Sequence, residues 1–86
     1  MKIYRLRLTT AAEKELDSLP TKAVDRIILA IRDLAAEPRP HGCKKLVGKK
    51  NTYRIRVRDY RVIYEVHDKE VVILVVRIGH RKDAYQ

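Results

Sequence analysis

The sequence lacks the cysteines that stabilise small secreted proteins and any apolar run long enough to span a membrane. Its 86 residues include one cysteine, no tryptophan and no phenylalanine. A single cysteine excludes an internal disulfide framework and is typical of a reducing cytoplasm. The longest apolar run, Val71 to Val76, is far shorter than the roughly 20 residues that a membrane helix needs. These absences predict a soluble, cytoplasmic protein with no membrane contact.

Motifs for secretion, metal binding and common kinds of catalysis are also missing. The N-terminal stretch M-K-I-Y-R-L-R-L interrupts its apolar residues with charges, so we expect no signal peptide. His41, Cys43, His67 and His80 do not have the spacing of zinc ligands, and there is no glycine-rich phosphate loop. We therefore predict no metal and no cofactor, and we interpret Cys43 as an inert small residue.

Acidic residues are scarce in one part of the chain, and this scarcity explains most of the net charge of +9. The segment from Arg39 to Arg61 holds nine Lys or Arg residues and a single acid, Asp59. The flanking segments are almost balanced, with seven basic against six acidic residues before it and four against four after it. A cluster of this kind indicates a polyanionic partner such as nucleic acid, with an acidic protein as the alternative.

The first part of the chain predicts a strand followed by a helix. Ile3 to Leu8 alternates between apolar and other residues, as a half-buried strand does. Thr10 and Glu13 have the spacing of a capping box, so we expect a helix to begin at Thr10 and to run to about Leu19.

Pro20 then breaks the first helix, and Thr21 is the predicted cap of a second. The apolar residues of this second helix repeat at helical spacing and predict one buried face. They are Val24, Ile27, Ile28, Ile31, Leu34 and Ala35. Because the break is so short, the two helices should form an antiparallel hairpin.

The remainder of the chain predicts an irregular connector and then strands. Pro38 to Gly42 ends the second helix, and a short strand is expected around Lys45 to Val47. Three longer strands follow, at Tyr53–Val57, Tyr60–Val66 and Val71–Ile78, with Gly79 ending the last one. We therefore predict one α+β domain over residues 1–86, with an N-terminal strand, an α-helical hairpin and an antiparallel β-meander. The helices should pack on one sheet face.

The hairpin formed by residues 53–66, Y-R-I-R-V-R-D-Y-R-V-I-Y-E-V, is the strongest functional signal. With Arg58 and Asp59 as its loop, its apolar residues face the helices, and Arg54 and Arg56 lie on the other face. Arg56 then lies opposite Arg61, which costs up to ~1 kcal/mol in charge repulsion. If no bulge shifts this register, the pairing indicates an anionic ligand such as phosphate, which guanidinium groups bind bidentately.

The ending I-G-H-R-K-D-A-Y-Q adds further candidates beside this hairpin. In an antiparallel meander the end of the last strand returns to the first turn, which brings Arg81 within reach of Arg56 and Arg61. Tyr85 could stack on a base or exchange a proton, although a frayed basic tail is an equal interpretation. We interpret Glu65 as one half of a cross-strand ion pair, and we expect His67 to be an exposed turn residue.

These motifs, together with E-L-x-x-L-P before the second helix and the ending G-H-R-x-x-x-Y, resemble the RelE branch of the RelE/ParE toxin superfamily over essentially the whole chain. The resemblance implies a helical hairpin on an antiparallel sheet. It also implies a type II toxin that enters the ribosomal A site and cuts the bound mRNA without a metal, by attack of the 2′-OH on the adjacent phosphate.

Matched to the family's motifs, the two strand lysines of the family correspond to Arg54 and Arg56, its hairpin arginine to Arg61, its later arginine to Arg81 and its C-terminal tyrosine to Tyr85. Replacing both lysines by arginine keeps the charge but removes a group that titrates more readily. His80 stands where the family can have a lysine, and it could substitute as an acid or base. The predicted catalytic residues are Arg56, Arg61, His80, Arg81 and Tyr85. The predicted phosphate-binding residues are Arg54, Arg56, Lys44, Lys45, Lys49, Lys50 and Lys82.

The resemblance also implies partners. These are the ribosome with A-site mRNA and a cognate RelB-like antitoxin, acidic and partly disordered when free, through which alone operator DNA would be bound. Two alternatives remain open at this point. One is a non-enzymatic, ParE-like inhibitor of DNA gyrase, and the other is a degenerate homologue that only binds RNA or its antitoxin.

Overall fold

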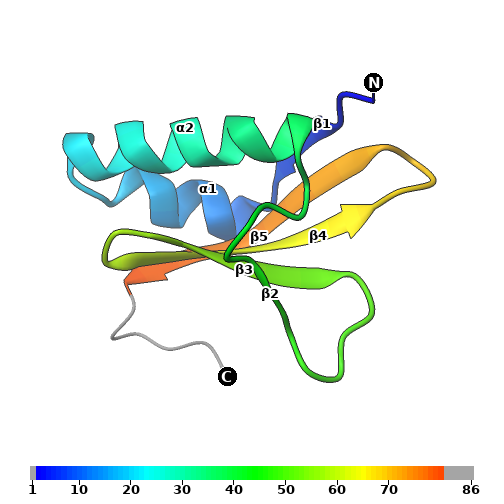
Figure 1. Cartoon of the computed structure of the whole chain (residues 1–86). Coiled ribbons are helices and arrows are strands. Elements are labelled where there is room, and N and C mark those ends of the chain that lie inside the picture. Colours follow the sequence, from blue (N-terminus) through cyan, green and yellow to red (C-terminus); the bar gives the residue numbers. More distant parts are fainter. Residues whose placement is uncertain (1, 81–86) are drawn as a thin grey trace.

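The protein folds as a five-stranded sheet with two helices on one of its faces (Figure 1). The computed structural model describes residues 2–80. The elements are β1 (Arg5–Leu8), α1 (Thr10–Asp17), α2 (Thr21–Ala36), β2 (Lys44–Lys45), β3 (Thr52–Val57), β4 (Tyr60–His67) and β5 (Val72–His80). This order and the antiparallel meander β3–β4–β5 confirm the predicted α+β fold.

The position of β1 makes the sheet mixed and not wholly antiparallel. The strand order is β1-β5-β4-β3-β2, and β1 runs parallel to β5, with Leu6 beside Ile73. A parallel partner requires a long crossover, and the rest of the chain between these two strands supplies it. No pattern in the sequence places β1 beside the last strand.

The core lies between the helices and the face of the sheet that they cover. Its β3–β4 members have the predicted parity, since Ile55, Val62, Tyr64 and Val66 are buried there. Ile28 differs from the prediction because it lies at the margin of the α2 stripe and is 39% exposed. The other buried residues of the core are Ala12, Ile27, Ile31, Leu34, Ile73, Val75 and Ile78.

The N-cap of the first helix lies one residue earlier than the sequence predicts. Thr9, and not Thr10, is the N-cap, because its Oγ1 accepts a hydrogen bond from the Ala12 amide at 3.1 Å. The same hydroxyl donates to the Val76 carbonyl oxygen at 2.8 Å. This tertiary bond to β5 fixes Thr9 at the cap. At its other end, α1 stops at Asp17, before the predicted Leu19.

The second helix starts at Thr21, but the prediction that Thr21 caps it is wrong. Pro20 occupies the N-cap with an extended backbone and no side-chain cap, and Thr21 is already helical. Proline has a fixed φ that suits the entry to a helix. The predicted break at Pro20 is therefore confirmed, whereas the cap is Pro20 and not Thr21. In the described part of the chain, no helix is long and apolar enough to cross a membrane.

Several strand boundaries also differ from the predictions. β1 begins at Arg5, not Ile3, and β2 covers Lys44–Lys45, not Lys45–Val47. β3 begins one residue earlier than predicted, at Thr52, and β4 ends one residue later, at His67. β5 begins at Val72, not Val71, and continues through Gly79 to His80. Pairing of Tyr60 with His80 satisfies backbone groups that a strand ending at Gly79 would leave open. This extension carries β5 to the level of the β3–β4 turn.

A group of polar side chains joins the connector after α2 to the turn between β4 and β5 and to the segment before β1. Arg39 binds Asp68 through Nη2 at 2.9 Å and donates from Nε to the Tyr53 hydroxyl at 2.9 Å. Tyr4 donates its hydroxyl to Asp68 Oδ1 at 2.6 Å. The hydrogen bonds from Arg39 and Tyr4 hold the pKa of Asp68 below its ordinary value. The connector therefore leads into β2 from a fixed point.

Candidate functional site

The β3–β4 hairpin has the register that its sequence predicts. Arg56 pairs with Arg61 and Val57 with Tyr60, so that Arg58 and Asp59 form a two-residue loop without a bulge. Two guanidinium groups therefore lie directly opposite each other on adjacent strands. Like charges so placed cost a few tenths to about 1 kcal/mol of stability.

The turn itself contains a backbone conformation that favours glycine. Arg58 has a φ of 59°, and Asp59 does not share this positive value. A two-residue turn with only its first loop residue at positive φ has the pattern of type II′, in which glycine is the usual first residue. The hairpin keeps its tight loop although an arginine occupies this position.

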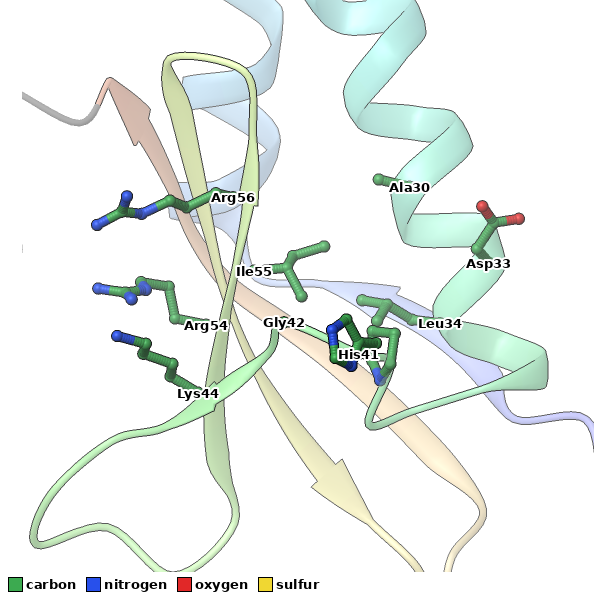
Figure 2. Close-up of a pocket in the computed structure, with 10 residues that line it drawn as sticks. Ala30, Asp33, Leu34, His41, Gly42, Lys44, Arg54, Ile55 and Arg56 are labelled. Atoms are coloured by element: carbon green, nitrogen blue, oxygen red, sulfur yellow. The ribbon is translucent and has the colours of Figure 1, made fainter.

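The arginines project from the sheet face that the helices leave uncovered, here called the open face. In Figure 2, Arg54, Arg56 and Lys44 point away from α2, whereas Ile55, between the two arginines, points toward it. Lys44 pairs with Arg54 across β2 and β3, and Arg61 pairs with Arg56 across β3 and β4. Three adjacent strands thus contribute four cations to one surface.

Two of these arginines carry buried donors that have no acceptor. The Nε atoms of Arg54 and Arg61 are shielded from solvent, and neither has a hydrogen-bond partner among residues 2–80. Ile63 lies opposite Arg54, shares this face with Arg61, and is only 8% exposed. Arginine stems commonly cover apolar surface in this way. A buried donor without an acceptor costs about 1–3 kcal/mol, which an anion on this face would recover once the arginine side chains turned to expose their Nε–H groups.

The electrostatics of Arg54 lead to the same conclusion. Burial lowers the pKa of its guanidinium, and the charges of Arg56 and Arg61 lower it further. Arginine nevertheless keeps its proton near neutral pH, so the repulsion remains in the folded protein. A cluster of cations of this kind suits an anion with several acceptor oxygens, such as a phosphate group.

The predicted lysines do not all belong to this cluster. Lys45 pairs with Tyr53, whose side chain packs against the core. Lys45 therefore lies on the opposite face of the sheet from Lys44. Lys49 and Lys50 are exposed in the loop between β2 and β3. These three lysines add positive charge around the edge of the open face.

Glu65 and His67 continue the open face along β4 beyond Ile63, and both differ from the predictions. Glu65 Oε1 lies 2.8 Å from Nε2 of His67, so the partner of Glu65 is two residues away on its own strand and not on a neighbouring strand. His67 is the last residue of β4 and is half-buried, not an exposed turn residue. The period-2 spacing of the two residues is the signal that could have identified this pair.

Of the predicted C-terminal set, the structure describes His80, and it places this residue away from the open face. His80 pairs with Tyr60 and its ring lies edge-on to the Tyr60 ring, with centroids 5.5 Å apart. Tyr60 packs against the core, so His80 lies on the helix-covered side of the sheet, whereas Arg61 lies on the open face. Arg81, Lys82 and Tyr85 lie outside the described residues.

A groove of about 470 Å³ runs along the edge of β3 beside the arginines (Figure 2). It forms because β2 pairs with only two residues of β3, which leaves the edge near Arg56 uncovered. Asp33 from α2 and His41 from the connector contribute to its lining, and sequence reasoning missed both. The groove joins the open face to the helix layer.

The described residues therefore offer cations and few groups for proton transfer. Among residues 2–80, no group of three or more His, Cys, Asp or Glu side chains is placed to hold a metal ion. What the open face can do chemically is to bind phosphate and to stabilise the extra negative charge of a phosphoryl transition state.

Comparison with known proteins identifies relatives that cover nearly the whole chain. The model of a family described as the ParE toxin of the type II toxin–antitoxin system parDE matches residues 6–85. Toxin RelG of Mycobacterium tuberculosis is 30% identical over 84 residues, which is 96% of this chain and 97% of the relative. The mRNA interferase toxin RelE of Escherichia coli K12 is 30% identical over 81 residues, covering 92% and 84%.

Solved structures of toxin–antitoxin complexes share the fold. A chain of the RelE–RelB complex from the archaeon Pyrococcus horikoshii is 34% identical with a TM-score of 0.83, covering 95% of this chain and 99% of that one. The RelBE2 complex of M. tuberculosis gives 30% identity and a TM-score of 0.82 over 94% of each chain. The intact E. coli RelBE complex gives 28% and 0.82, over 96% and 99%.

Proposed function

Because this chain belongs to the ParE toxin family of type II toxin–antitoxin systems, and within it to the RelE type, we propose that it is an endoribonuclease that cuts mRNA in the ribosomal A site. The name of its E. coli relative, an mRNA interferase, supports this activity, and so does the cationic face on three adjacent strands. The convergence of Arg54, Arg56 and Arg61 on one face, with Arg56 directly opposite Arg61, is the observation that carries the proposal, because a bound phosphate would compensate the repulsion among them.

In the proposed reaction the 2′-OH of one nucleotide attacks the adjacent phosphate without a metal ion. The O2′–P bond forms and the P–O5′ bond breaks, which gives a 2′,3′-cyclic phosphate and a 5′-hydroxyl end. Arg61 and Arg81 would hold the scissile phosphate and stabilise the charge that develops on it, while Arg54 and Arg56 position the RNA. Lys44, Lys45, Lys49, Lys50 and Lys82 would draw the strand to this face.

Proton transfer falls to the C-terminal residues in this proposal. Tyr85 would exchange a proton or stack on a base, and His80 is the second candidate acid or base. Since His80 contacts Tyr60 on the helix-covered side, its contribution is tested separately from that of the arginines. The described part of the face is richer in charge stabilisation than in bases. We therefore expect free RNA to be cut poorly, with the ribosome aligning the 2′-OH for attack.

The proposed partner that restrains the toxin is a RelB-type antitoxin. RelB is the partner named in the RelE complexes with similar folds, and an acidic, partly disordered segment would complement the excess charge of +9. Binding across the open face would place carboxylates where we propose that RNA phosphates lie.

The experiment that tests the function is a translating extract in which mRNA 5′ ends are mapped by primer extension. Wild-type protein should give cuts phased with codons. Arg61→Ala should reduce them by about 100-fold or more, because it removes a donor to the developing charge. Tyr85→Phe and His80→Gln test the proton-transfer roles one at a time.

Arg58→Ala is the matched control, because it removes the same charge from the same hairpin but from its turn. This variant should keep the cleavage pattern of the wild type.

The family model that matches is named for ParE, so a DNA supercoiling assay should run in parallel. Intact mRNA together with blocked gyrase supercoiling would contradict the nuclease. Robust cleavage of free RNA would contradict its dependence on the ribosome.

A further inference from the structure

We propose that Glu65 and His67 form a nucleobase subsite on the open face, which reads the hydrogen-bonding edge of a nucleotide next to the scissile phosphate. This inference rests on the proposed function only in assuming that the open face binds RNA. It assigns a role to two residues of β4 that are not part of the proposed phosphate site, and it makes the sequence preference of the protein depend on one carboxylate.

The strand register places the pair next to the arginines. Glu65 pairs with Thr52 of β3 and with Leu74 of β5. Arg54 is two residues from Thr52, so it is the diagonal neighbour of Glu65, at roughly 7 Å between Cα atoms. A nucleotide whose phosphate is held at Arg54 and Arg61 therefore has its neighbour within reach of Glu65.

The two side chains are locked together but still accessible. Glu65 Oε1 and His67 Nε2 are 2.8 Å apart, and each side chain is 34% exposed. The contact fixes the carboxylate and leaves its second oxygen, Oε2, as an acceptor for a ligand. The exposed part of the His67 ring is the surface that we propose stacks on a base.

The surface around the pair has the properties of a base-binding site. Leu74, half-buried, lies opposite Glu65 on β5 and offers apolar surface on which a flat ring can lie. Across β5, Arg7 of β1 pairs with Leu74 and is exposed, so it can bind the phosphate beyond the base. The subsite thus lies between two cationic regions of one face.

The choice of partner for Glu65 also points to a ligand. On a face with an excess of arginine, a carboxylate would be expected to neutralise a guanidinium group. Glu65 instead contacts His67, and within residues 2–80 no ion pair joins it to Arg54 or Arg61. The arrangement keeps the arginines available for phosphate and keeps a negative charge at a separate, fixed position.

Carboxylate chemistry predicts which base fits. Guanine presents two adjacent N–H donors on its Watson–Crick edge, which suit the two oxygens of a carboxylate. Adenine and cytosine present one amino group beside an acceptor nitrogen, which a carboxylate repels. Uracil presents a single N–H between two carbonyl oxygens. The expected order is therefore guanine first, then adenine and cytosine, then uracil.

The test measures binding of the purified toxin to trinucleotides of 2′-O-methyl RNA, which cannot be cut, with each of the four bases at one position. Wild type should bind guanine about tenfold more tightly than uracil. Glu65→Gln replaces one acceptor by a donor, and its affinity order should shift toward adenine and cytosine. Glu70→Gln, with the same loss of charge in the next turn, should keep the wild-type order.

Mapped cleavage sites in a translating extract supply the second measurement. Glu65→Gln should redistribute the cuts among sequences while total cleavage stays within a few-fold of wild type. His67→Gln keeps a partner for Glu65 but removes the ring, and it should weaken binding of all bases. An equal loss of cleavage at every sequence in Glu65→Gln would indicate a role in proton transfer and overturn the subsite.

The two measurements separate failure of the subsite from failure of the function. If the wild type discriminates between bases in binding but cuts no translated mRNA, the proposed function is wrong and the subsite stands. If the wild type cuts mRNA and Glu65→Gln changes neither the affinity order nor the cut sites, the subsite is wrong and the function stands.

Discussion

The two faces of the β3–β4 hairpin differ in almost every physical respect, although their residues alternate along the same strands. On the helix-covered face, Val62 and Tyr64 are completely buried, and the Tyr64 hydroxyl donates to the Pro38 carbonyl oxygen at 2.7 Å. On the open face, Arg56 and Arg61 lie opposite each other, and the Nε donor of Arg61 is unsatisfied. Burial on one face lowers the free energy of the fold, whereas the other face holds like charges opposite each other. We therefore expect stability and the proposed RNA binding to be separable by single substitutions.

The largest effect should come from the covered face. Tyr64→Ala removes a fully buried ring that stacks on Tyr53, with centroids 5.9 Å apart, and we expect it to lower the free energy of unfolding by about 3–5 kcal/mol. Arg61→Ala, three residues away on the same strand, should not lower that free energy, because it removes the repulsion from Arg56 together with an unsatisfied buried donor. Urea denaturation followed by circular dichroism measures both. Comparable losses in the two variants would mean that the faces are not separable.

Arg56→Glu should have the next largest effect, and with opposite signs for activity and stability. A glutamate opposite Arg61 turns repulsion into attraction and should raise the free energy of unfolding by about 1 kcal/mol. Cleavage of translated mRNA should fall by about 100-fold, because a carboxylate then occupies the phosphate site. Arg56→Gln is the control and should give an intermediate stability. A less stable Arg56→Glu variant would show that the arginine pair does not strain the hairpin.

A smaller gain is expected at the turn. Arg58→Gly places glycine at a φ of 59°, so it removes backbone strain at the cost of greater freedom in the unfolded chain. The net result should be about 0.5 kcal/mol of added stability with unchanged cleavage, measured by thermal unfolding and primer extension. Arg58→Ala removes the same charge but keeps the strain, so it should not be stabilised. Equal stability of the two variants would assign the gain to charge.

The smallest effect should appear at low pH, at the cluster formed by Tyr4, Arg39 and Asp68. Hydrogen bonds from Arg39 and Tyr4 hold the pKa of Asp68 below its ordinary value of 3.8. A lowered pKa stabilises the fold fully above that ordinary value, and the contribution disappears as the pH falls through the lower, folded value. Wild type should therefore lose more stability than Asp68→Asn as the pH drops below about 4. Parallel pH profiles of the two proteins would contradict this role for Asp68.

Local patterns were sufficient for the secondary structure and for the parity of the hairpin. The alternation of residues 53–66 predicted that Ile55 would be covered and that Arg56 would face Arg61, because side chains on a strand alternate with a period of two. The helix caps were predicted less well. Thr9 caps α1 because its hydroxyl also reaches the Val76 carbonyl oxygen, and that contact joins residues 67 positions apart.

By itself, the sequence determined that this chain has a covered face and a cationic face, since charge clustering and periodicity are local properties of the residues. Only the tertiary structure decided that β1 lies parallel to β5, that Glu65 is held by His67, and that His80 lies on the side opposite to Arg61. These features depend on which strands become neighbours and in which register they pair. The free energy that selects them is distributed over the whole core and is not contained in any single segment.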